Sequence, residues 1–162
     1  MNNIIHSVKY TGTSGYGGHG IESYYSNNAL IANNMIYDMQ GDGYTSITGS
    51  SMAGIVIRYS NENKVYFNSV NLFGDYTRSN ATITSAFFAD ANSSELDVRN
   101  NIFANQGVLG YFNSTDQISL ASLRAATGKD VHSINVDPEF TSNTDLHTSN
   151  SDLSSMGTYT RH

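Results

Sequence analysis

Apolar and polar positions along this chain alternate with a period of two inside short segments. The stretch "GIVIRYS" (residues 54–60) places two isoleucines on one face and a valine and an arginine on the other. The stretch "KVYFNSVNLF" (residues 64–73) alternates in the same way until Asn68 interrupts it. Alternation of this kind is typical of short β-strands, and the interruption indicates a bend between two of them. The pattern therefore predicts an all-β protein of short strands.

These segments recur at a nearly constant spacing. The stretch "GIESYYSNNALIANNMIYDM" from Gly20 aligns with "GIVIRYSNENKVYFNSVNLF" from Gly54 at an offset of 34. A third copy from Ala86 follows at an offset of 33, with Phe88 in the place of Ile55. Such repeats bury their apolar faces only by stacking. We expect a parallel β-solenoid of about three to four turns, with units near residues 20–53, 54–85 and 86–118 and a truncated copy before them.

An asparagine occupies the same place in every unit. Asn34, Asn68 and Asn101 each follow an aliphatic residue by three positions and precede an apolar residue by two. Equivalent residues of a parallel solenoid stack ~4.8 Å apart, and a bend leaves backbone groups that no strand pairs. An asparagine can bond those groups and the asparagine of the next turn. We predict an internal asparagine ladder; the alternative is three unrelated surface residues in an Asn-rich chain.

One segment has helical periodicity. In "SLASLRAATGKD", the apolar residues Leu120, Leu123 and Ala126 fall on one face. Ser119 is a suitable N-cap, and Gly128 suits the C-terminal end. The pattern predicts one short helix near residues 119–127, lying across the solenoid as a cover. It opens a closing segment, residues 119–162.

The repeats resemble the right-handed parallel β-helix repeats of the pectin-lyase-like superfamily. The closing segment resembles the end of β-helix domains in cell-surface and secreted proteins of Bacteroidetes-type bacteria, where a Gly-x-Asp-x-x-Ser turn precedes Asp-Pro-x-Phe and Asp-Leu-His-Leu. The corresponding residues here are Gly128, Asp130, Ser133, Asp137, Pro138, Phe140, Asp145, Leu146 and His147. Thr148 replaces the final leucine of that pattern, so we expect a looser last turn.

The resemblance covers nearly the whole chain and has several implications. It implies a right-handed parallel β-helix, with residues 1–162 as a single domain. It also implies a fragment of a longer exported protein, with neighbouring domains, located outside the cell or on a bacterial cell surface.

Composition narrows the classes of partner. The net charge is -6, with only 8 Lys+Arg, so a nucleic-acid partner is not expected. The chain has no cysteine, which excludes disulfides and thiolate metal sites. No apolar run reaches the ~20 residues of a membrane span. We expect no metal and no cofactor.

The superfamily also contains polysaccharide lyases and glycoside hydrolases, so catalysis is the alternative. The strand "IVIRYS" resembles a Leu-Arg-His-Gly strand of chondroitinase-B-like lyases, with Arg58 in place of the arginine. However, Tyr59 replaces the histidine, and Tyr25 stands where the catalytic lysine is expected. The catalytic base is therefore missing. Ca²⁺ is implied only under this alternative.

A hydrolase would need carboxylates ~5–9.5 Å apart across one glycosidic bond. In the alignment, Asp90 matches Ser23 and Ile57, and no two carboxylates share a column in adjacent units. Asp42 in "GDGYT" and Asp75 in "GDYT" are typical of turns. The catalytic candidates are therefore Arg58, which the resemblance to the lyase strand implies, and Asp42, Asp75 and Asp90, which are selected by residue type.

A second functional signal is aromatic. Tyr24 and Tyr25 align beside Arg58 and Tyr59 of the next unit. If these side chains point outward, they form a strip that can stack on sugar faces; the alternative is that one tyrosine of each pair caps the core. We therefore predict a non-catalytic extracellular module with an adhesive or glycan-binding role and a polysaccharide or cell-surface glycan as partner. The alternative is a lyase or hydrolase domain acting on acidic polysaccharide.

Overall fold

The structure is a computed structural model of the chain. It describes residues 1–12, 16–41, 51–72, 84–105, 108–112, 114–129, 132–142, 145 and 147–154. Short β-strands dominate this part of the chain, and α1 (Leu120–Thr127) is its only α-helix. Within the same ranges, no helix has both the length and the apolar character needed to cross a membrane.

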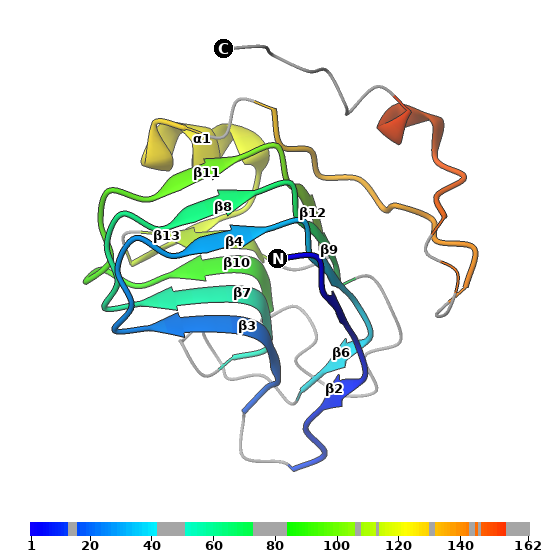
Figure 1. Cartoon of the computed structure of the whole chain (residues 1–162), viewed down its shortest axis with the longest axis horizontal. Coiled ribbons are helices and arrows are strands. Elements are labelled where there is room, and N and C mark those ends of the chain that lie inside the picture. The colour runs from blue at the N-terminus through cyan, green and yellow to red at the C-terminus, as the bar shows by residue number, and fades with distance from the viewer. Residues whose placement is uncertain are drawn as a thin grey trace.

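Most strands belong to parallel sheets whose neighbouring strands come from successive repeat units (Figure 1). The largest sheet contains β3 (His19–Tyr24), β7 (Ala53–Arg58), β10 (Ser85–Ala89) and β13 (Val108–Phe112), with β14 (Thr115–Gln117) antiparallel at its edge. A second sheet contains β4 (Leu30–Ala32), β8 (Lys64–Tyr66) and β11 (Asp97–Arg99). A third contains β1 (Ile4–Ile5), β5 (Met35–Ile36), β9 (Ser69–Asn71) and β12 (Ile102–Ala104). β2 (Val8–Lys9) pairs with β6 (Met39–Gln40). The arrangement is compatible with the predicted β-helix.

Columns of aliphatic side chains run between these sheets and form the core. Ile31 pairs in register with Val65, which pairs with Val98. In the third sheet, Ile36 pairs with Val70, and Val70 with Phe103. All of these residues are buried in one hydrophobic cluster. The alignment of the sequence predicted both columns, because the period-2 pattern and the repeat spacing together specify which residues stack.

The register of β10 differs from the predicted one. The alignment places Phe88 opposite Ile55, but in the structure Phe87 pairs with Ile55 and Phe88 pairs with Val56. A slip of one residue moves every side chain of a strand to the other face. Phe87 therefore lies in the core, where its ring stacks on Phe103 with centroids 5.9 Å apart. Phe88 packs on the opposite face against Tyr111, with centroids 4.8 Å apart.

An additional residue in the turn after β10 explains the shift. The predicted spacing is recovered at Ser94, which bridges to Asn61. Three residues separate Ile57 from Asn61, whereas four separate Ala89 from Ser94. A gapless alignment cannot place an insertion that lies inside a turn, so it assigned the wrong face to β10.

The predicted helix is confirmed as α1. The Ser119 hydroxyl accepts a hydrogen bond from the Ser122 backbone N–H, and Gly128 ends the helix at a φ of 65°. Leu123 is fully buried in the core cluster. A Cβ added to Gly110 of β13 would lie 3.2 Å from Leu123 Cδ1. The absence of a side chain at Gly110 therefore leaves room for Leu123 to pack against β13. α1 packs against β13 and β14, at the end of the stack opposite β3 (Figure 1).

The closing segment continues the third sheet before leaving it. The Ile134 N–H donates to the Asn101 carbonyl, and the Phe103 N–H donates to the Ile134 carbonyl. Farther along, the Phe140 ring packs edge-on against the Tyr37 ring, with centroids 6.1 Å apart. Thr148, which stands where the resembled sequence pattern has leucine, donates its hydroxyl proton to the Pro138 carbonyl. Asp130 and Leu146 lie outside the described residues.

Candidate functional site

A column of asparagines joins successive units at the bend between the second and third sheets. Asn34 Nδ2 donates to Asn68 Oδ1 at 2.8 Å, and Asn68 Nδ2 donates to Asn101 Oδ1 at 3.0 Å. The backbone N–H groups of Asn34 and Asn68 donate to the same oxygens. Asn3 extends the column at one end, and the Ser133 hydroxyl accepts the Asn101 N–H at the other. The three predicted ladder residues are buried, so this column is an internal support and not a binding surface.

A left-handed residue precedes every asparagine of the column. Asn2, Asn33, Phe67 and Asn100 have φ angles between 55° and 59°. Asparagine adopts this conformation more readily than most residues with a side chain. The first residue of each pair therefore turns the backbone, while the second bonds across units.

The candidate site is a cluster of exposed tyrosines at the corner where β3 and β7 end. We define the tyrosine cluster as Tyr24, Tyr25 and Tyr59 together with Arg58. The rings of Tyr25 and Tyr59 stack, with centroids 4.9 Å apart and an interplanar angle of 15°. Tyr24 stands edge-on to both, at 4.6 Å and 5.8 Å. The residues Tyr24, Tyr25 and Tyr59 are 52%, 68% and 39% exposed.

The backbone of two successive units positions these rings. Tyr24 pairs in register with Arg58, so the residues that follow them, Tyr25 and Tyr59, are stacked in turn. Both have a φ of 50°, in the left-handed region. The column of tyrosines stops at the third unit, where the register places Asp90 beside Arg58 and the next residue is Ala91. Sequence reasoning placed the four residues in adjacent units, and the structure brings all four into contact.

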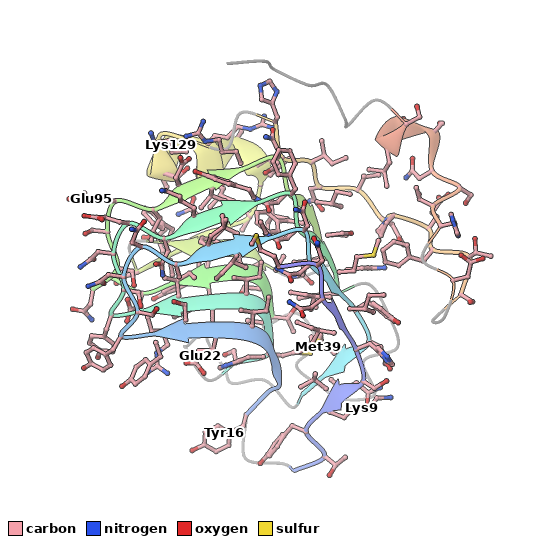
Figure 2. The ribbon with its side chains drawn as sticks, in the orientation of Figure 1. Lys9, Tyr16, Glu22, Met39, Glu95 and Lys129 are labelled. Atoms are coloured by element: carbon pink, nitrogen blue, oxygen red, sulfur yellow. The ribbon has the colours of Figure 1, made fainter. Side chains whose placement is uncertain are left out.

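Arg58 is held by two neighbours. Its Nη1 lies 3.4 Å from Glu22 Oε1, and its Cζ lies 5.2 Å from the centre of the Tyr24 ring. The other carboxylate oxygen of Glu22 lies 3.3 Å from His19 Nδ1. Sequence reasoning missed Glu22, although Glu22 and Tyr24 share a strand face at a spacing of two. Figure 2 shows Glu22 beside β3.

Tyr25 is a weak candidate for a base. Its pKa is raised, first by partial desolvation and then by the neighbouring Tyr24, Tyr59 and Asp90. The phenol therefore stays protonated at neutral pH and can donate or accept a hydrogen bond.

Asp90 supports a turn. Its Oδ1 accepts from the Tyr59 N–H at 3.2 Å, the Asn92 N–H at 3.2 Å and the Ser93 hydroxyl at 2.7 Å. One unit earlier, the Tyr25 N–H donates to the Arg58 carbonyl instead. The Asp90 carboxylate thus accepts the Tyr59 N–H, in the role that the Arg58 backbone carbonyl has for the Tyr25 N–H. Asp42 and Asp75, the other acidic candidates, lie outside the described residues.

Carboxylates and histidines do not gather into a metal site in the part of the chain that the structure describes. No group of three or more His, Cys, Asp or Glu side chains there could hold a metal ion.

A groove of about 550 Å³ lies at another corner, between the starts of β8 and β11 and the end of α1. Buried Leu96 and Phe112 contribute apolar side chains to it. Charged residues of both signs also line it: Glu62, Lys64, Glu95, Asp97 and Lys129. Figure 2 shows Glu95 and Lys129 at the end of the stack away from Glu22. Sequence reasoning missed this groove, because its lining comes from segments that only the fold brings together.

Comparisons of the chain with models of protein families, with curated proteins and with solved structures give no match.

Proposed function

We propose that this chain is a segment of right-handed parallel β-helix that acts as a non-catalytic glycan-binding module. The three larger sheets are its faces, and the tyrosine cluster is its contact surface. The protein is exported and works outside the cell or on a bacterial cell surface. The observation that carries this proposal is the exposure of three tyrosine rings in mutual contact at one corner.

Tyrosine rings of this kind suit a sugar ligand. An aromatic face packs on the apolar C–H face of a pyranose ring, while the hydroxyl reaches a hydrogen-bond partner. Tyr25 is the most exposed of the three, and its ring is supported by Tyr59. A ring held by a stacked neighbour loses less side-chain freedom on binding, which favours affinity.

The same contacts favour binding over catalysis. A lyase needs a basic side chain to remove a proton, and a hydrolase needs a carboxylate pair. Tyr25 keeps its proton, and Arg58 is occupied by Glu22 and Tyr24. The Asp90 carboxylate is bonded within a turn. These side chains have structural partners that a catalytic role would have to displace.

Binding to a panel of immobilised neutral and acidic polysaccharides tests the proposal. Tyr25→Ala is expected to weaken binding about two- to tenfold, the usual range for an aromatic contact. Tyr16→Ala is the matched control, because Tyr16 is also exposed but lies outside the cluster. No unsaturated product and no new reducing ends should form.

Two results would contradict the proposal. One is an equal loss of binding in the Tyr25 and Tyr16 variants. The other is turnover of an acidic polysaccharide that disappears in Arg58→Ala, which would favour the lyase alternative. Thermal melts of each variant separate lost binding from lost folding.

A further inference from the structure

We infer that the tyrosine cluster takes an uncharged glycan and rejects polysaccharides that carry carboxylates. This inference rests on the proposed function and specifies its ligand class. It follows from how the charges around the rings are paired.

Negative charge exceeds positive charge at the cluster. Glu22 and Asp90 contribute two carboxylates, and Arg58 contributes one guanidinium. Asp90 is close enough to the rings to raise the pKa of Tyr25. The two carboxylates and the guanidinium sum to one negative charge, and the formal charge of the whole chain is -6. A polyanion therefore meets an unfavourable field both locally and over the molecule.

Arg58 cannot offset this field without giving up its present partners. Its Nη1 faces Glu22 Oε1 at 3.4 Å, and its Cζ lies over the Tyr24 ring at 5.2 Å. Arginine binds a carboxylate best through two parallel N–H bonds. A uronate that took this position would compete with Glu22 and bring a second carboxylate beside it. Among the described residues, Arg58 is the only cation that stacks on a ring of the cluster.

The groups that remain available suit hydroxyl-rich ligands. The phenol groups of the cluster donate and accept hydrogen bonds, and Tyr25 keeps its proton. Ring faces and neutral hydroxyls together match a pyranose that presents C–H and O–H groups and no charge.

Two matched pairs of polymers test the inference. The first pair is homogalacturonan with its carboxyl groups methyl-esterified and the same polymer as the free acid. The second is hydroxyethyl cellulose and carboxymethyl cellulose. In each pair the backbone is shared and the charge differs. The uncharged member is expected to bind at least about fivefold more tightly at low ionic strength, and the gap should narrow as salt screens the charges.

A variant that should gain binding to acidic polymers tests whether the Glu22–Arg58 pair causes the selectivity. Glu22→Gln removes the carboxylate that occupies Arg58, so binding of the free acids should rise about two- to fivefold, the range of an exposed ion pair. Binding of the uncharged polymers should change less than binding of the free acids, because they carry no carboxylate for Arg58 to pair with. Glu139→Gln is the control, because it makes the same chemical change in the closing segment, away from the cluster.

The outcomes separate the two proposals. If the acidic member of a pair binds as tightly as the uncharged one, or more tightly, the ligand class is wrong while glycan binding stands. If Glu22→Gln and Glu139→Gln change acid binding equally, the Glu22–Arg58 pair is not the selective element. If none of the four polymers binds, both the inference and the proposed function fail.

Discussion

At each bend of this chain, one residue turns the backbone and the next residue forms hydrogen bonds to the neighbouring unit. The left-handed turn falls on the residue before each ladder asparagine, and this residue is Asn33, Phe67 or Asn100. The asparagine that follows satisfies polar groups of the next unit. Phe67 shows that the turning position accepts a residue other than asparagine, and its ring is exposed. Stacking therefore constrains the second position more strongly than the first.

Three adjacent side chains on the second sheet, Tyr66, Asp97 and Arg99, are joined by hydrogen bonds. Arg99 Nε donates to Asp97 Oδ1 at 2.6 Å, and the Tyr66 hydroxyl donates to Asp97 Oδ2 at 2.6 Å. The bond from Arg99 is the main cause that lowers the pKa of Asp97; burial opposes it and the Tyr66 bond adds to it. For Tyr66, which donates to Asp97, burial and this hydrogen bond raise the pKa to about 12.

The first prediction follows from the lowered pKa of Asp97. A carboxyl with a lower pKa in the folded state stabilises the fold above its unfolded pKa of about 4, and this stabilisation is lost as the pH falls through the folded pKa. Asp97→Asn should therefore cost up to about 1 kcal/mol at neutral pH, because the Arg99 side chain is 47% exposed and solvent weakens the ion pair. Below about pH 4 the cost should shrink.

Urea unfolding of both proteins, from neutral pH to about pH 3, measures this difference. Asp116→Asn is the control, since Asp116 is exposed on β14. A cost for Asp97→Asn that does not change with pH would show that the ion pair contributes nothing to stability.

At the scale of elements, the asparagine column links strands that come from different units. Asn68 is bonded on both sides, because it accepts from Asn34 and donates to Asn101. Its Nδ2 also donates to the Ile31 carbonyl at 3.0 Å. These bonds pair the buried side-chain amide of Asn68 with both neighbouring asparagines and with one backbone carbonyl.

The second prediction concerns this middle asparagine. Asn68→Leu keeps the side-chain bulk but leaves buried polar partners unsatisfied, so it should reduce the free energy of unfolding by about 1–3 kcal/mol. Asn135→Leu is the same chemical change at an exposed position, and it should cost less than about 0.5 kcal/mol. Denaturant melts measure both values. Equal losses would mean that the column does not support the fold.

For the whole molecule, the arrangement of sheets predicts a gradient of local stability. β7 and β8 have strand neighbours on both sides, and so does β9. β3 and β4 have a strand neighbour on one side within the described residues. Stacked repeats gain most of their stability from neighbouring repeats, so the middle unit should open least often.

Native-state hydrogen exchange tests this third prediction. Amides of β7, β8 and β9 should exchange most slowly, and those of the two-residue strands β1 and β2 most rapidly. Uniform protection along the chain would indicate a single cooperative unit and contradict the gradient.

The strands, the stacked columns and the ends of the helix could be predicted from the sequence, because each depends on neighbouring residues or on the repeat spacing. The period-2 pattern predicts strands, the constant spacing predicts which residues of the second and third sheets stack, and Ser119 and Gly128 mark the ends of α1. The residues of the asparagine column and of the tyrosine cluster followed from the same spacing. Each of these needs only the order of residues and the geometry of strands and helices.

The tertiary structure alone decided the features that depend on an irregular turn or on side chains from distant segments. One extra residue after β10 reversed its faces and placed Phe87, not Phe88, in the core. The Glu22–Arg58 pair and the groove beside α1 also escaped sequence reasoning. The physical reason is that a single inserted residue or one rotamer changes which groups meet across units, while the hydrophobic pattern within each unit stays the same.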